Sequence, residues 1–265
     1  MADYEPLMIQ KKWFAEFTQS VDEIVAEHRS VAGPELIALQ DVFCLLNELL
    51  REVWVNDPSL ATAGSRPKVA LIAHTLHLLL STLDAGLRGR MSAAFNNLRS
   101  IGESPSLLLH MNFWPKTAMA VLEGTVKDMD SYEVVAKVAN RIEQDQPGEG
   151  EDWKRVANKW ANTVQEFSHL SRTAMLASLG QKDGNIAIGP IGVVDADRFR
   201  GLVTLLLSKG LEILHACTMI FPHPLVPNSQ WLKYANQVIE QAAPVVTEMQ
   251  RNLLGPSVTE AEANH

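Results

Sequence analysis

Of all the residue patterns in this chain, two Glu-x-x-His pairs are the most suggestive of a metal site. They are Glu166 with His169 and Glu212 with His215. Residues at i and i+3 lie on one face of a helix. Two such pairs, with a carboxylate from each of two further helices, form the di-iron site of ferritin-like bundles. One hypothesis is therefore a metal-dependent helical-bundle enzyme that holds a divalent metal.

The order of the pairs along the chain argues against this metal site. The two predicted helices that carry them are consecutive, whereas a ferritin-like order places a carboxylate helix between them. Glu103 or Glu123 would have to supply a further carboxylate. His74 and His77 also share a helical face, but two histidines alone are an incomplete ligand set. We therefore expect no cofactor, and a bound divalent metal is the alternative.

A charged pair, Arg99 and Glu103, stands at i, i+4 spacing on an otherwise apolar predicted helix, and His110 falls near the same face if that helix is continuous. Burying a lone ion is costly, so such a pair must be matched internally or line a cleft. The favoured interpretation is a structural ion pair. The alternative is a polar pocket for a ligand or partner, formed by these three residues.

Basic residues gather between Gly64 and Gly102, where Arg88 and Arg90 flank a glycine in a predicted turn. Guanidinium groups in a turn can contact phosphate, so nucleic-acid contact is a further alternative. The formal net charge of −8 disfavours it, because binding to nucleic acid depends on Lys and Arg. The chain has no Gly-rich phosphate loop, Gly-x-Ser-x-Gly elbow, His-Glu-x-x-His motif or Cys-x-x-Cys pair.

Apolar residues recur at helical spacing along most of the chain, and hydrophobic residues make up 46% of it. The predicted helices cover residues 8–29, 34–54, 67–85, 91–101, 107–127, 132–143, 152–179, 195–220 and 230–253, with a polar loop at 145–150. Ser104-Pro105 predicts either a kink or the start of a new helix. Short connections favour an all-α antiparallel helical bundle, with one small β-hairpin or extended loop near 184–194.

A Gly- and Pro-containing stretch before Pro67 predicts a boundary in the chain. We divide the sequence into an N-terminal helical arm at 1–62, a main helical bundle at 63–254 and a flexible acidic tail at 255–265. Three aromatic residues on one face of the arm would form a docking element. These are Trp13, Phe14 and Phe17. The leading hypothesis is a binding protein whose partner is another protein or a second copy of itself.

Two apolar runs, at 69–87 and 202–221, raise the question of membrane spans. Ionisable residues interrupt both runs, and these are costly at the centre of a bilayer. They are His74, His77, Asp84, Lys209, Glu212 and His215. We interpret both runs as core helices and expect no membrane contact. The N-terminus lacks a signal-peptide pattern, and Cys44 and Cys217 are expected to be buried free thiols, which fits a cytoplasmic protein.

Residues 93–103 contain a Leu-Arg-x-x-x-Glu helix, and a Leu-Ser turn at Leu170-Ser171 precedes a Gly-Pro hairpin and a closing helix that ends at Phe221. From Pro67 onward, this pattern resembles a group of uncharacterised bacterial all-helical proteins that are distantly HEPN-like. The resemblance implies that Arg99 and Glu103 are a signature polar pair inside the bundle. It also implies a dimer and an accessory role in a bacterial defence or toxin–antitoxin system.

Catalytic HEPN ribonucleases carry an Arg followed by His after four to six residues, and this chain has no such motif. Arg66 and His74 come closest and are one residue too far apart. We therefore expect no metal-independent ribonuclease activity. The leading expectation is a helical interaction protein, with a metal-dependent enzyme and a nucleic-acid-contacting defence protein as alternatives.

Overall fold

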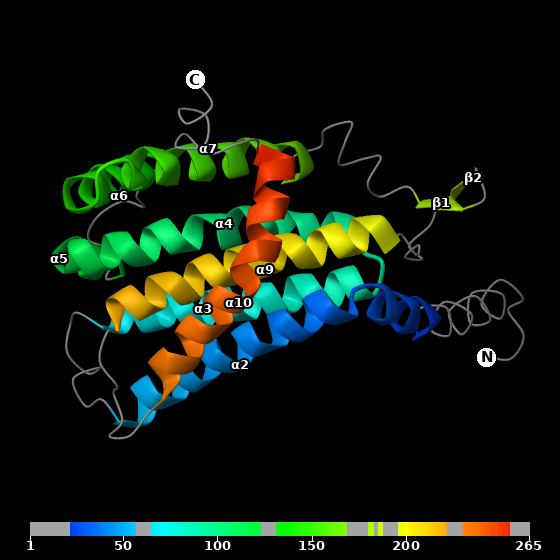
Figure 1. Cartoon of the computed structure of the whole chain (residues 1–265), viewed down its shortest axis with the longest axis horizontal. Coiled ribbons are helices and arrows are strands. Elements are labelled where there is room, and N and C mark those ends of the chain that lie inside the picture. Colours follow the sequence, from blue (N-terminus) through cyan, green and yellow to red (C-terminus); the bar gives the residue numbers. More distant parts are fainter. Residues whose placement is uncertain are drawn as a thin grey trace, which may run out of the picture.

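Helices dominate the structure, which confirms the predicted all-α class (Figure 1). The computed structural model describes residues 22–56, 65–122, 131–168, 180–182, 185–187, 196–221 and 230–254. Its helices are α2 (Gly33–Asn56), α3 (Arg66–Leu87), α4 (Met91–Phe113), α5 (Pro115–Leu122), α6 (Ser131–Asp145), α7 (Glu149–Ser168), α9 (Ala196–Ile220) and α10 (Trp231–Leu254). The proposed docking residues of the N-terminal arm and the acidic tail lie outside the described residues.

The helices form an inner and an outer layer. The inner layer consists of α2, α3, α4 and α9, which share one hydrophobic core. In the outer layer, α10 packs on α2 and α9, while α6 and α7 pack on each other and on α4. Figure 1 shows α10 crossing the inner helices and the α6–α7 pair lying alongside α4. Both grooves described below lie where an outer helix meets two inner ones.

Helix α2 belongs to the same core as the rest of the inner layer. Gly210 of α9 lets α2 approach closely, because a Cβ there would lie 2.9 Å from Cγ1 of Val42. The Trp231 indole N–H of α10 donates to the carbonyl of Leu45 of α2 at 2.7 Å. Helix α2 thus packs on α9 and α10, and the division expected at 62/63 stays a prediction.

Helix α4 continues through Pro105, so Ser104 does not begin a new helix. Its hydroxyl instead donates to the carbonyl of Ser100 at 2.8 Å and accepts a hydrogen bond from Thr75 of α3 at 2.9 Å. This buried hydroxyl pair links α3 to α4. Because α4 is continuous, Arg99, Glu103 and His110 all lie on the same helix.

The connection from α6 to α7 is shorter than the predicted loop at 145–150, because α6 extends to Asp145 and α7 begins at Glu149. The turn uses Gly148 at a φ of 93°, a conformation that favours glycine. The carboxylate of Glu143 accepts the N–H groups of Gly148 and Gly150 at 2.8 and 3.0 Å. A negative charge thus caps the positive end of α7.

The two described strands, β1 (Gly180–Lys182) and β2 (Asn185–Ala187), pair antiparallel with Gln181 opposite Ile186. They begin before the region predicted at 184–194, of which residues 184 and 188–194 lie outside the described residues.

Of the two cysteines, Cys217 is buried, and burial raises the pKa of its thiol. Cys44 is exposed, so the expectation that both thiols are buried is wrong for this one. The apolar positions of α2 that face the core include Leu39, Val42 and Leu46, and Cys44 falls between them on the outward side.

By length and composition alone, two described helices could cross a membrane: α3 and the Arg198–Ile220 part of α9. They differ in how much of their most apolar stretch is buried within the protein, at 67% for α9 and 39% for α3. Helix α9 is thus enclosed as a core helix, whereas α3 leaves much of its apolar length uncovered.

Candidate functional site

The pair of Arg99 and Glu103 lies at the surface and not inside the bundle. Nε of Arg99 is 3.1 Å from Oε1 of Glu103, and the two side chains are 49% and 36% exposed. The neighbouring positions Leu98 and Ile101 take the buried face of α4, which turns the charged pair toward solvent. Exposed ion pairs contribute about 0–1 kcal/mol, so this pair is a surface feature of α4.

His110, on the same helix, is separated from that pair by its burial. The side chain is buried, and its ring packs against Trp114 with 4.7 Å between ring centroids and 33° between ring planes. Its Nδ1 has no hydrogen-bond partner among the described residues. Desolvation lowers the pKa of the imidazole, Lys137 of α6 lowers it further, and Glu133 opposes the change. His110 is thus buried while Arg99 and Glu103 are partly exposed, and the polar pocket of these three residues stays a prediction.

We expect His110 to make the fold less stable in acid. Because its folded-state pKa is depressed below the ordinary 6.5, the unfolded chain binds the proton first as the pH falls through that value. The contribution of neutral His110 to the free energy of unfolding is therefore fully present above pH 6.5. It is lost as the pH falls from 6.5 through the folded-state pKa. Urea unfolding at about pH 7.5 and about pH 5.5 should show a smaller loss in His110→Leu than in the wild type.

His215→Leu is the matched control, since His215 is exposed on α9. This variant should keep the acid sensitivity of the wild type. Equal acid sensitivity in His110→Leu and the wild type would contradict a depressed pKa at His110.

The two arginines considered for nucleic-acid contact lie at the turn between α3 and α4. Nε of Arg88 is 3.0 Å from both carboxylate oxygens of Asp84, and Gly89 adopts a φ of 69° between the arginines. Arg90 is exposed just before α4. Asp84 neutralises one of the two charges, and nucleic-acid contact stays a prediction.

The residues of the Glu-x-x-His pairs are only partly described. Helix α7 contains Glu166, but its side chain and His169 lie outside the described residues. The carboxylate of Glu212 is held by Nζ of Lys209, and His215 is exposed. Among the described residues there is no group of three or more His, Cys, Asp or Glu side chains arranged for a metal. The di-metal site stays a prediction.

Lys209 is the buried charge that sequence reasoning missed. It is 2% exposed, donates to both carboxylate oxygens of Glu212 at 2.8 and 2.7 Å, and lies 4.5 Å from the ring centroid of Trp160. The Trp160 indole N–H donates in turn to the carbonyl of Leu98 at 3.3 Å. Gly102 provides the space for the indole, because a Cβ there would overlap it. This cluster joins α4, α7 and α9.

A groove of about 210 Å³ opens above this cluster, between α4, α7 and α9. Three of its polar lining residues, Ser106, Asp152 and Trp153, have partners within the protein. The Trp153 indole donates to the hydroxyl of Ser106 at 3.1 Å, and Arg155 pairs with Asp152 at 3.2 Å. Because these donors and acceptors already have partners, none of them needs a ligand to satisfy its hydrogen bonding.

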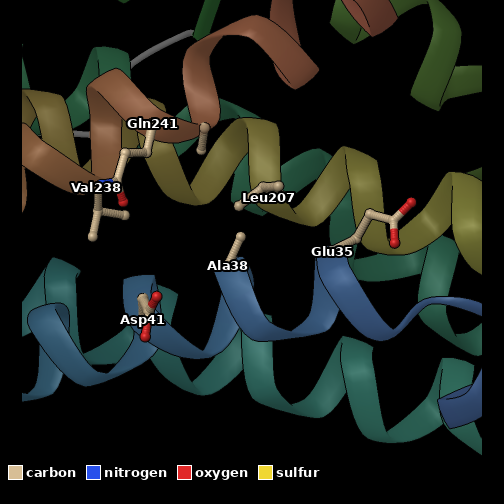
Figure 2. A pocket seen from close by; sticks show the side chains of 7 residues that line it. Glu35, Ala38, Asp41, Leu207, Val238 and Gln241 are labelled. Atoms are coloured by element: carbon tan, nitrogen blue, oxygen red, sulfur yellow. The ribbon is translucent and has the colours of Figure 1, made fainter.

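A second groove of about 210 Å³ lies between α2, α9 and α10 (Figure 2). Its lining residues are Glu35, Ala38, Asp41, Leu207, Val238, Gln241 and Ala242. The middle of this α2–α9–α10 groove is small and apolar, and two carboxylates of α2 stand along it. Figure 2 shows Glu35 and Asp41 on either side of Ala38.

Glu35 carries an unsatisfied acceptor at this groove. Its Oε1 is 3.5 Å from Nε of Arg200, whose guanidinium also donates to the carbonyl of Val31. Its Oε2 is buried and has no hydrogen-bond partner among the described residues. An unmatched buried acceptor costs about 1–3 kcal/mol, and more when it is charged. A bound donor would recover that free energy, which makes the α2–α9–α10 groove the candidate binding site.

Comparison of the chain with family models, with curated proteins and with solved structures finds no match.

Proposed function

We propose that the protein is a non-catalytic helical binding module that holds a segment of a partner protein in the α2–α9–α10 groove. The observation that supports this is the buried Oε2 of Glu35, which has no hydrogen-bond donor among the described residues and belongs to a residue that lines an apolar groove. An accessory role in a bacterial defence or toxin–antitoxin system, as the resemblance implies, would make the partner another component of that system.

The charges of the groove specify the partner segment. Its floor is apolar, so the segment must present a small apolar side chain at its centre. Glu35 and Asp41 are six residues apart on α2, which separates them by about 9 Å along the helix axis. A partner helix that carries Lys or Arg at positions about six or seven residues apart, on either side of an alanine, matches both carboxylates.

Fluorescence anisotropy with a labelled helical peptide of that pattern tests the proposal. We expect the Lys peptide to bind and a peptide with Glu at both Lys positions not to bind. Glu35→Gln should weaken binding by about 10-fold to 100-fold, because a hydrogen bond to a charged group contributes about 1.5–3 kcal/mol.

Glu48→Gln is the matched control, since Glu48 is on the same helix and pairs with the exposed Arg51 away from the groove. This variant should bind like the wild type. The proposed function is wrong if the wild type does not distinguish the two peptides, or if the two glutamine variants bind equally.

A further inference from the structure

One lysine lies partly inside the protein without a carboxylate to balance its charge. Nζ of Lys68, on α3, donates to Oδ1 of Asn112 on α4 at 3.2 Å and is 5.9 Å from the ring centroid of Phe221, just after α9. No carboxylate of the described residues pairs with it, whereas the more deeply buried Lys209 is held by Glu212. Lys68 therefore lies where three helices meet, with a neutral amide oxygen as its hydrogen-bond acceptor.

The start of α3 also opposes a positive charge at this position. Lys68 is the third residue of the helix, and the N-terminus of a helix carries a partial positive charge. The first turn contains no acidic residue, and the side chain of Ser65 does not cap it. Burial removes water from the ammonium form and so lowers the pKa of Lys68. The position of the amine in the helix, its burial and its lack of a counter-charge all favour the neutral form.

A neutral lysine amine is a nucleophile, because its nitrogen lone pair is not taken up by a proton. The side chain of Lys68 is only partly buried, so a small molecule can reach Nζ. Other lysines of the chain are differently placed. Lys137, for example, is 52% exposed and its Nζ is 2.6 Å from a carboxylate oxygen of Glu133. Lys68 is thus the lysine whose surroundings suit attack on an electrophile.

We propose that Lys68 is a site of acylation by small acyl phosphates. Nζ forms a bond to the acyl carbon, and the bond from that carbon to the phosphate oxygen breaks. The amine proton passes to the departing phosphate, so the products are an acylated lysine and inorganic phosphate. The positive end of α3 favours an anionic acyl donor over a neutral one.

Acylation also suits the surroundings of the amine. The product is uncharged, which removes the unbalanced cation from the partly buried position, and its amide N–H can still donate to Asn112. This site is separate from the α2–α9–α10 groove and does not depend on the proposed function.

Incubation of the full chain with acetyl phosphate at about pH 7.5, followed by peptide mass spectrometry, tests the proposal. Lys116 is the internal reference, because it also lies in the first turn of a helix but is exposed. We expect Lys68 to be acetylated at least about tenfold faster, since the neutral fraction rises about tenfold for each unit by which the pKa falls. In concentrated urea the two lysines should react at similar rates. Equal rates in the folded chain, or a preference for Lys68 that persists in urea, overturns the proposal.

Asn112→Asp gives a second readout, because it places a carboxylate next to Nζ with almost no change in shape. The negative charge should raise the pKa of Lys68 and slow its acetylation at least about tenfold. Asn96→Asp is the matched control, since Asn96 is exposed on the same helix, about 24 Å from position 112 along its axis. This variant should react like the wild type, and circular dichroism checks that both keep their helix content. Equal acetylation of Lys68 in the two variants contradicts the proposal.

Discussion

Replacing Glu212 with leucine should destabilise the fold by about 3–5 kcal/mol, as expected when one partner of a buried ion pair is removed. Lys209 is almost fully buried, and both Glu212 oxygens lie within hydrogen-bond distance of its Nζ. Without the carboxylate, the ammonium group keeps its contact with the Trp160 ring but loses the hydrogen-bonded counter-charge. Urea denaturation at neutral pH measures the loss as a lower midpoint.

Glu48→Leu is the control for this prediction. Glu48 also forms an ion pair within one helix at a spacing of three, but with the exposed Arg51. Its removal should cost less than about 1 kcal/mol. The double variant Lys209→Met/Glu212→Leu replaces both charges with apolar groups and should recover most of the loss. Equal costs for Glu212→Leu and Glu48→Leu would show that Lys209 does not depend on its partner.

Replacing Gly102 with alanine should destabilise the fold by about 1–3 kcal/mol, although alanine is the better helix former. The Trp160 indole occupies the space in which a Cβ of residue 102 would be placed. The indole cannot yield easily, because it donates to the carbonyl of Leu98 and lies against Lys209. The added methyl group must therefore push α7 away from α4.

Gly201→Ala provides the opposite expectation on the same physical principle. Gly201 is also within a helix, and no atom lies within 4 Å of the position that its Cβ would take. Alanine should stabilise that helix by about 0.5–1 kcal/mol through its higher helix propensity. Thermal unfolding followed by circular dichroism compares the two variants. Stabilisation by Gly102→Ala would mean that Trp160 does not lie against the backbone of α4.

The helices were predictable because apolar periodicity is a local property of the sequence. The predicted helix at 67–85 corresponds to α3 at Arg66–Leu87, and the predicted helix at 34–54 to α2 at Gly33–Asn56. The sequence did not decide where every helix ends. Pro105 allows either a break or a continuous helix, and the packing of Ser104 against Thr75 decides for continuity. The exposure of Cys44 depends on which side of α2 faces its neighbours.

The candidate site was not predictable, because it depends on which helices meet in space. Lys209 and Trp160 contact each other from α9 and α7, and Glu35 meets Arg200 across 165 positions of sequence. Reading the chain alone, Glu212 is grouped with His215 through their spacing, whereas its carboxylate is held by Lys209. One sequence signal does point to the α2–α9–α10 groove. Glu35, Ala38 and Asp41 follow one another at a spacing of three, so a small residue lies between two acidic ones along the same side of the helix.

The hydrogen bond from Trp231 to the carbonyl of Leu45 joins positions 186 residues apart. At a ribosomal rate of about 5–20 residues per second, roughly 10–40 s separate the synthesis of these two residues. For most of that interval, the apolar side of α2 has been made while α9 and α10 have not. The core around α2 therefore cannot be completed until near the end of translation. The early half of the nascent chain is the part that a holding chaperone would protect.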